Sequence, residues 1–504
     1  MFVKLRSAAL FGLSCIPVEV EVDIHKGQTN FNIIGLTDAS IQEAKDRIYS
    51  AIKNSGYKYP FNFKILVNLA PANFHKEGPS YDLPMAVGII LATLNQTPFT
   101  DDILVLGELA LDGTIRPIPG ILSVALYAKE SGIKNIIVPE QNAPEAALVE
   151  GLCILPAKKL EEVVGYFLQE QTLIPFAKTI DQKDEALTTH LDMADIKGQE
   201  FAKRALEIAA SGGHNILLSG PPGSGKTLLS RALPTILPEL TEKEILEITK
   251  IYSASGLLKN NLIKIAPFRS PHHTISSSAL AGGGSSPRPG EVTLAHRGVL
   301  FLDEFPEFSK ASLEALRQPL EDGNITISRV RGSVSFPARF ILVASQNPCP
   351  CGFATDPDQH CRCSASNLLR YQKKISGPIL DRIDLHIEVP RLTFEKLSNN
   401  KPGEPSKEIR QRVQAAREIQ LERFKKTEII TNSEMTNREI EKYCQLDKES
   451  NQLLGSAVNH LHLSARSYGR ILKIARTIAD LDKQNFICQK HIAEALQFRT
   501  KTII

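Results

Sequence analysis

The spacing of apolar positions divides the chain into three stretches of different character. Up to about residue 168, short apolar runs alternate with stretches of helical period. The strands predicted there include 18–23, 63–69 and 134–139, and the helices include 83–94 and 121–131. Strands and helices alternate again from 192 to 396, and continuous apolar runs such as 298–302 are typical of a buried parallel sheet. From 397 to 504, apolar residues recur three and four positions apart, which predicts helices.

Two stretches without either period separate these regions. Residues 169–191 carry mixed charge, and residues 398–405 are rich in Asn, Pro and Gly. We therefore predict an N-terminal α+β domain (1–168), a linker (169–191), an α/β domain with a parallel sheet (192–396) and a helical C-terminal domain (397–504). Three domains agree with a chain of 504 residues at roughly 150 residues per domain.

Composition narrows the functional class. Lys and Arg total 59 and Asp and Glu total 56, so a net charge of +3 excludes a uniformly basic, histone-like binder. No apolar run approaches the roughly 18 residues of a membrane span, and the first residues lead into a strand rather than a signal cleavage site. We expect a cytoplasmic protein. Residues 401–504 carry 19 basic and 13 acidic side chains, which favours an anionic partner, although a solvated basic helix face is the alternative.

The strongest chemical signal is a glycine-rich loop between an apolar strand (215–219) and a helix that starts near Leu228. The loop consists of Gly220, Pro221, Pro222, Gly223, Ser224, Gly225, Lys226 and Thr227. Such a P-loop turns backbone N–H groups toward phosphate oxygens at a helix N-terminus. Lys226 would contact the β- and γ-phosphates of ATP, and the Thr227 hydroxyl would bind Mg²⁺. A glycine-rich turn by chance is the alternative, and both flanks argue against it.

Two carboxylates follow the next buried strand. The run 298–302 ends in Asp303 and Glu304. In a parallel sheet this position lies beside the P-loop, at the carboxyl edge. We predict that Asp303 belongs to the Mg²⁺ shell and that Glu304 polarises the attacking water. An acidic pair at a strand end without a catalytic role is the alternative.

A third strand (340–345) leads to Asn347, and with it the chain resembles the AAA+ ATPases. The resemblance implies that Asn347 is sensor 1, which orients the water near the γ-phosphate. Arg382, in the segment 377–384, matches the arginine finger that enters the neighbouring subunit's site. Arg466, at the start of a C-terminal helix, matches sensor 2. A finger supplied in trans implies a ring, usually a hexamer.

Additional segments point to one branch of these ATPases. A glycine-rich stretch (281–291) precedes Asp303, and residues 324–336 have the alternation of a β-hairpin with an Arg-x-Arg-Gly tip. The arrangement resembles the helix-2 insert and pre-sensor-1 hairpin of magnesium chelatase and the MCM helicases. Arg329 and Arg331 at the tip are the candidate contacts to DNA phosphates, with a solvated turn as the alternative. Arg288 in the insert is a second candidate.

Four of the eight cysteines form two close pairs within a Cys-rich insert (349–363). Cys349 with Cys351, and Cys361 with Cys363, can present four thiolates to a structural zinc ion. The C-x-C spacing strains that geometry, a disulfide is the alternative, and His360 could replace one ligand. The neighbouring pair His272–His273 is interpreted as structural or as an interface rather than a metal site.

The N-terminal domain resembles the protease domain of Lon-type enzymes. The run Lys76–Ser80 places Ser80 at the nucleophile position of that family, and residues 107–120 resemble the following Lon segment. The family's catalytic lysine would fall at Leu122, so Ser80 has no activating base. We expect a protease fold without protease chemistry.

Together, the Lon-like domain, the AAA+ module and the helical C-terminal (lid) domain resemble the YifB/ComM family of magnesium-chelatase-like bacterial ATPases. That resemblance implies a homo-hexameric, ATP- and Mg²⁺-dependent DNA helicase or translocase. Its action would be branch migration on branched or single-stranded DNA, in homologous recombination and natural transformation. The alternatives are the motor subunit of a magnesium chelatase and an ATP-driven protein remodeller.

Overall fold

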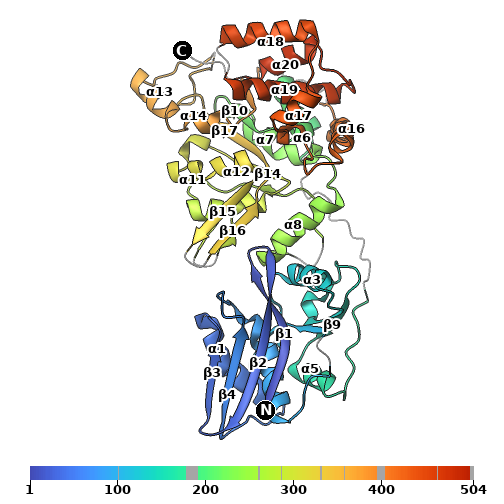
Figure 1. The fold of residues 1–504 in the computed structure, drawn as a ribbon. Coiled ribbons are helices and arrows are strands. Elements are labelled where there is room, and N and C mark those ends of the chain that lie inside the picture. Colours follow the sequence, from blue (N-terminus) through green and yellow to red (C-terminus); the bar gives the residue numbers. More distant parts are fainter. Residues whose placement is uncertain are drawn as a thin grey trace.

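The chain folds into two bodies joined end to end (Figure 1). The computed structural model describes residues 1–99, 102–177, 191–258, 262–284, 287–329, 332–356, 358–393, 403–461 and 464–499. The blue and teal N-terminal segment forms one body, and the green, yellow and red segments form the other (Figure 1).

The N-terminal body is built on a mixed seven-stranded sheet of order β3-β4-β2-β1-β5-β8-β9. Its strands are β1 (Phe2–Phe11), β2 (Ser14–Lys26), β3 (Asn30–Ile34), β4 (Phe63–Ala70), β5 (Ile103–Val105), β8 (Asn135–Pro139) and β9 (Cys153–Ala157), and β6 (Glu108–Leu109) pairs with β7 (Ile115–Arg116). Its helices are α1 (Ala39–Asn54), α2 (Asp82–Thr93), α3 (Ile121–Glu130), α4 (Ala143–Ala146) and α5 (Leu160–Phe167). The apolar helix α2 packs on β1 and β2 and is buried almost throughout, so the sheet has a substantial core. The strands and helices predicted for this region are confirmed within one or two residues, except that β2 extends several residues beyond 18–23 at both ends.

The second body contains a five-stranded parallel sheet of order β11-β14-β17-β10-β18. The strands are β10 (Ile216–Ser219), β11 (Phe268–Arg269), β14 (Val299–Leu302), β17 (Ile341–Gln346) and β18 (Leu385–Glu388). The helices of this part are α6 (Glu200–Gly212), α7 (Lys226–Ala232), α8 (Glu242–Ala254), α9 (Ser277–Ala281), α10 (Glu291–Leu294), α11 (Lys310–Ala315), α12 (Arg317–Asp322), α13 (Ala365–Gln372) and α14 (Gly377–Leu380). Because the strands are parallel, the segments that follow β10, β14 and β17 emerge at one edge.

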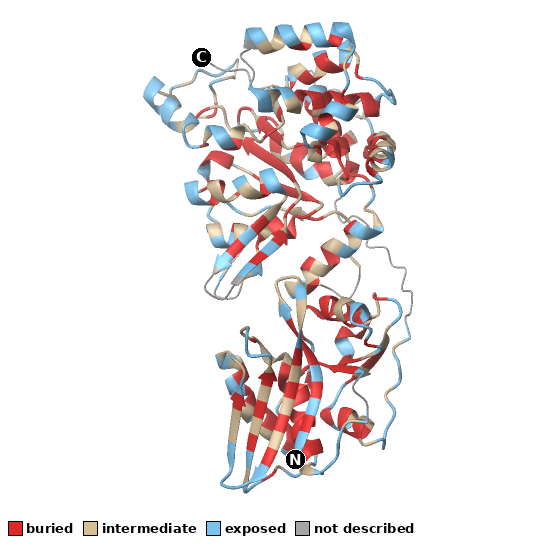
Figure 2. Cartoon of the chain, in the orientation of Figure 1, coloured by how far each residue is buried: buried red, intermediate tan, exposed pale blue. Residues whose placement is uncertain are grey.

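Alternate residues of these strands point to opposite faces of the sheet and pack in two separate hydrophobic clusters. Both faces are therefore apolar, which explains the continuous apolar runs. One face of the sheet packs with the C-terminal helices in a single cluster. The other face packs with α9, α11 and the hairpin described below. The C-terminal helices are α16 (Ser406–Phe424), α17 (Asn437–Tyr443), α18 (Lys448–Leu461), α19 (Ala465–Leu481) and α20 (Gln489–Gln497). The helical region therefore shares a hydrophobic core with the sheet, and Figure 2 shows the buried residues running from the strands into these helices.

The predicted hairpin is present as β15 (Asn324–Arg329) paired antiparallel with β16 (Gly332–Pro337). A short ribbon from the glycine-rich stretch, β12 (Gly282–Gly283) with β13 (Arg288–Pro289), lies against it. At Gly282, φ is +100°, and a Cβ atom would lie 2.6 Å from the Arg288 carbonyl oxygen and 2.9 Å from Ile327, so this close approach requires glycine. From the other side, Phe11 and Leu13 of the β1–β2 turn pack into the same core.

The two bodies also touch where α8 packs on α3. The Gly120 N–H donates to the Ser253 carbonyl at 3.0 Å, and the Ser253 hydroxyl donates to the buried carboxylate of Glu145. Among the described residues, none of the helices combines the length and apolar character that crossing a membrane requires.

Candidate nucleotide site

The loop 220–227 connects β10 to α7 and has the backbone that its glycines predict. Helix α7 begins at Lys226, two residues before the predicted start. Gly223 and Gly225 have φ values of +77° and +93°, which side chains other than glycine rarely adopt. At Gly220 a Cβ atom would lie 2.1 Å from the Val389 carbonyl oxygen, so the loop packs directly on the chain beyond β18.

The buried ammonium of Lys226 is folded over the loop. Its Nζ donates to the carbonyls of Gly220 and Pro221 at 2.7 and 2.9 Å, and to Asn347 Oδ1 at 3.3 Å. Burial lowers the pKa of Lys226, and the nearby carboxylate of Asp303 opposes that shift. The contact with Asn347 brings the end of β17 to the P-loop.

Asp303 lies between two hydroxyl groups. Thr227 Oγ1 donates to Asp303 Oδ2 at 3.1 Å, and the Ser345 hydroxyl donates to Asp303 Oδ1. Hydroxyl and carboxylate oxygens so close together are the donors that Mg²⁺ prefers. The Ser224 hydroxyl is buried without a hydrogen-bond partner in the described structure, which leaves a polar group for a ligand in the loop. The residues therefore fit a nucleotide with its Mg²⁺.

Glu304 stands at the rim of the same site with its side chain 59% exposed. Its φ is +54°, a left-handed conformation that is uncommon outside glycine and recurs at functional sites. His273 Nδ1 lies 3.1 Å from Glu304 Oε2. No pattern in the sequence indicated this contact, because only the fold brings the two side chains together. The prediction that His272 and His273 are structural or interface residues did not include this contact with a carboxylate of the candidate site.

A cavity of about 640 Å³ opens at this edge of the sheet. Lys226, Asp303, Glu304 and Asn347 all line it, so the structure brings the predicted P-loop, acidic pair and sensor 1 together. The sequence did not predict the outer wall of this cavity. Cys349 and Pro350 form part of it, together with three residues of α13 and one residue just after that helix. Those four are Asn367, Arg370, Tyr371 and Lys374.

The two predicted arginines, Arg382 and Arg466, lie outside this cavity, and both contact the same carboxylate. Arg382 Nη2 forms an ion pair with Glu321 Oε2, and Arg466 Nη2 lies 3.3 Å from Glu321 Oε1. The hydrogen bond from Arg382 lowers the pKa of Glu321, and the charges of Arg382 and Arg466 add to the effect. All three residues line a second cavity of about 590 Å³, and none of them lines the nucleotide cavity.

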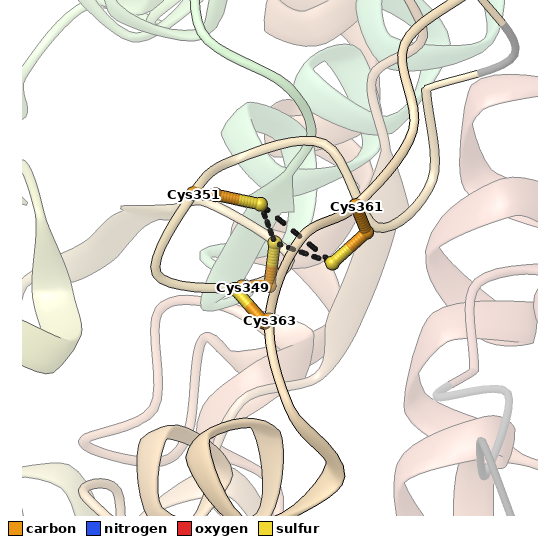
Figure 3. Close-up of side chains that lie close together, drawn as sticks. All are labelled: Cys349, Cys351, Cys361 and Cys363. Carbon is orange, nitrogen blue, oxygen red and sulfur yellow. Dashed lines mark hydrogen bonds between the residues drawn. The ribbon is translucent and has the colours of Figure 1, made fainter.

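The four cysteines of the insert converge on one point (Figure 3). Their sulfur atoms all lie within 4.8 Å of one another, with separations of 3.3, 3.6 and 3.7 Å among Cys349, Cys351 and Cys361. All four are free thiols, and His360 is not a member of the group. Backbone N–H groups of Phe353 and Arg362 lower the pKa of the Cys351 thiol to about 6.

The candidate DNA contacts are only partly described. Arg329 ends β15, but its side chain and the whole of Arg331 lie outside the described residues. Arg288 is exposed on β13, beside the hairpin. In the N-terminal domain Ser80 lies in a short turn (Pro79–Tyr81), while Leu122 is fully buried in an apolar cluster.

Comparison with known proteins covers nearly the whole chain. Family models described as magnesium chelatase subunit ChlI match residues 20–142 and 192–397, and a model of the ChlI C-terminal region matches 403–499. YifB of Escherichia coli is 44% identical over 500 residues, covering 98% of this chain and 96% of that protein. The competence protein ComM of Haemophilus influenzae is 44% identical over 509 residues, with the same coverage.

A shorter similarity concerns the N-terminal domain. Lon protease 2 of Bacillus subtilis is 26% identical over 171 residues, which cover 31% of this chain and 30% of that protein. This agrees with the Lon-like interpretation of the first domain. The full-length identities decide the assignment: the chain belongs to the magnesium-chelatase-like AAA+ family that includes YifB and ComM.

Proposed function

We propose that this protein is a ring-forming ATPase that drives branch migration of DNA. The observation that carries the ring is the position of Arg382 and Arg466. Both guanidinium groups meet at Glu321 and neither reaches the nucleotide cavity of its own chain. If they act on a phosphate, that phosphate belongs to a neighbouring subunit.

Within one subunit, the described residues account for binding and water activation. Lys226 exchanges its carbonyl contacts for phosphate oxygens, and Thr227 and Asp303 would hold Mg²⁺. When bound, Mg²⁺ neutralises the charge that develops on the phosphates. Glu304 orients the attacking water and accepts its proton, with His273 holding the carboxylate in place. Asn347 orients the same water from the end of β17.

At the subunit boundary, Glu321 has a holding role. Its single carboxylate binds both guanidinium groups, and because its pKa is lowered it stays charged. The more highly charged γ-phosphate of a neighbour would compete for both guanidinium groups. Hydrolysis would then require the ring.

The DNA contact is assigned to the hairpin β15–β16 and the adjacent ribbon β12–β13. Buried Ile325, Ile327, Val334 and Phe336 anchor the hairpin in the core. Exposed Arg288 extends the same surface. A ring would bring one such hairpin from each subunit to a central channel, where long cations contact phosphates without reading sequence.

Replacing Arg329 and Arg331 together with alanine should weaken DNA binding equally on all sequences. For every phosphate that the variant no longer neutralises, the slope of log K against log salt should become shallower by about 0.7 to 0.9. Basal ATPase activity should persist, because the nucleotide cavity is built from other elements. Salt titrations by fluorescence anisotropy measure both the affinity and the slope.

The exposed pair Lys129 and Lys134 of the N-terminal domain offers a control with the same charge change. Its double alanine variant should bind DNA as the parent does. An unchanged affinity and salt slope in the Arg329/Arg331 variant would remove the hairpin from the DNA contact, and the basic C-terminal region would become the next candidate.

The function itself is tested with a labelled synthetic four-way junction. The intact protein should resolve the junction only with hydrolysable ATP and Mg²⁺, and DNA should stimulate its ATPase. A second candidate, the motor subunit of a magnesium chelatase, is favoured by the description of the matching family models. ATPase activity that DNA does not stimulate, together with an unresolved junction at every salt concentration, would favour that candidate. ATP-dependent unfolding of a stably folded test protein would instead favour a protein remodeller.

A further inference from the structure

Burial in a hydrophobic core does not explain the position of helix α13. It projects from the edge of the second body (Figure 1), and none of its residues is buried (Figure 2). A helix of 8 residues is marginal on its own in water, because nucleation is costly. Even so, Arg370 and Tyr371 of this helix line the nucleotide cavity, as does Lys374 just beyond it.

The contacts on its cavity side are few and mostly polar. Lys374 Nζ lies 2.7 Å from Glu307 Oε2, and both side chains are exposed to solvent, where such an ion pair contributes little. Leu368 and Tyr371 are half-buried, and burial raises the pKa of Tyr371 to about 12. The ion pair of Lys374 and the ring of Tyr371 lie at the end of α13 rather than at its start.

The four cysteines lie at that start. Cys363 directly precedes Ser364, whose hydroxyl caps α13, and Cys349 follows Asn347 at the end of β17 by two positions. The cysteine cluster is therefore the point at which the sensor 1 strand and α13 come together (Figure 3). Any group that binds all four sulfur atoms would join these two elements.

The sulfur separations fit a single tetrahedral ion. Bonds of about 2.3 Å to zinc place the sulfur atoms of a tetrahedron about 3.8 Å apart. The separations of 3.3, 3.6 and 3.7 Å are close to that value, whereas a disulfide joins only two sulfur atoms, at about 2.05 Å. Four thiols within 4.8 Å of one another thus favour one soft metal ion over two disulfides.

The loop that carries the first two cysteines also packs on the P-loop. The Gly352 N–H donates to the Cys349 carbonyl at 2.9 Å, which closes a tight turn and brings Cys351 back beside Cys349. Gly352 has φ +87°, and a Cβ atom there would lie 2.6 Å from Pro222. The turn consequently touches the nucleotide loop as well as sensor 1.

We propose that Cys349, Cys351, Cys361 and Cys363 bind one zinc ion, and that this ion fastens α13 to the end of β17. On binding, each thiol gives its proton to solvent and the thiolate becomes a ligand. The ion then keeps Arg370 and Lys374 at the mouth of the nucleotide cavity. The consequence for ATP rests on the proposed function, whereas the zinc site and the anchoring of α13 do not.

The test compares the full-length protein with a Cys361→Ser/Cys363→Ser variant, both produced in zinc-supplemented medium. Elemental analysis should find about one zinc per chain in the parent and none in the variant. Hydrogen exchange of residues 365–372, measured without nucleotide, should become faster in the variant. Affinity for a fluorescent ATP analogue should fall about tenfold, the effect of removing one charge-assisted hydrogen bond. A Cys15→Ser/Cys153→Ser variant, altered at two cysteines outside the cluster, should match the parent in all three measurements.

A variant that fails to fold would not test the proposal, so zinc is also removed reversibly from the parent protein with a chelator. Zinc removal should accelerate exchange in 365–372, and restoring zinc should reverse it. The proposal would be overturned if the parent contained no zinc or showed an iron–sulfur absorption spectrum. It would also be overturned if hydrogen exchange in 365–372 did not change on zinc removal. Stoichiometric zinc with unchanged nucleotide affinity would overturn the link to the cavity. A parent that holds zinc but hydrolyses no ATP would overturn the proposed function alone.

Discussion

Replacing Glu304 with glutamine should leave ATP bound while turnover falls by roughly 10²- to 10⁴-fold. Three carboxylates line the nucleotide cavity, and those of Asp303 and Glu307 are bound by hydroxyl groups and by Lys374, respectively. We therefore propose that the exposed carboxylate of Glu304 accepts the proton of the attacking water. Glutamine keeps the shape of the side chain but cannot accept that proton. Lys226 and Thr227, which we propose bind the phosphates and Mg²⁺, are untouched, so nucleotide binding should survive. Equilibrium binding of a fluorescent ATP analogue and the rate of phosphate release separate the two effects.

Glu314 provides a control for this substitution. It is a carboxylate on the nearby α11, it pairs with Arg317 at 2.9 Å, and it does not line the cavity. Its glutamine variant should hydrolyse ATP within a few fold of the parent rate. A Glu304→Gln variant that turns over at the parent rate would show that another group accepts the proton.

Replacing Arg382 with alanine should lower kcat by about 10³- to 10⁵-fold, the range observed when an arginine finger is absent. ATP affinity should change little, because Arg382 lies outside the cavity of its own chain and its guanidinium is held by Glu321. Steady-state ATPase assays at saturating ATP, together with binding measurements, test both statements.

Arg317 offers the matching control, since it is an exposed arginine of α12, the helix that carries Glu321. Its alanine variant should retain activity. Arg466→Ala should change kcat in the same direction as Arg382→Ala, because both side chains bind the same carboxylate. Parent-like turnover in Arg382→Ala would mean that this arginine is not a finger.

The nucleotide cavity was the most predictable part of this molecule. Its residues follow the ends of parallel strands, and strand ends can be located from apolar runs alone. The register Ser219 with Gln346 places the P-loop beside Asn347, as the order of motifs along the chain implies. The alternation in 324–336 likewise predicted a hairpin, because one face of it is buried.

Contacts between distant segments were not predictable in the same way. Glu321 meets Arg382 and Arg466 across 61 and 145 positions, and no local period encodes such a meeting. The contact of His273 with Glu304 has the same origin. The apolar pattern also separated the helical region 397–504 from the sheet. In the structure the two share one hydrophobic cluster, because α16 and α19 pack on α6, which itself packs on β10 and β18. The position of the cysteine turn against Pro222 required the fold as well.

The central claim is that one complete ATP site needs two subunits, and a mixing experiment tests it most directly. The Lys226→Ala variant keeps Arg382 but lacks the lysine that we propose binds phosphate, and the Arg382→Ala variant has the opposite defect. Each alone should be almost inactive. Mixed in equal amounts, they should recover about a quarter of the parent ATPase activity, since a random ring pairs an intact P-loop with an intact Arg382 at about one boundary in four. A mixture that stays as inactive as its components, although mass measurements show mixed rings, would contradict the claim.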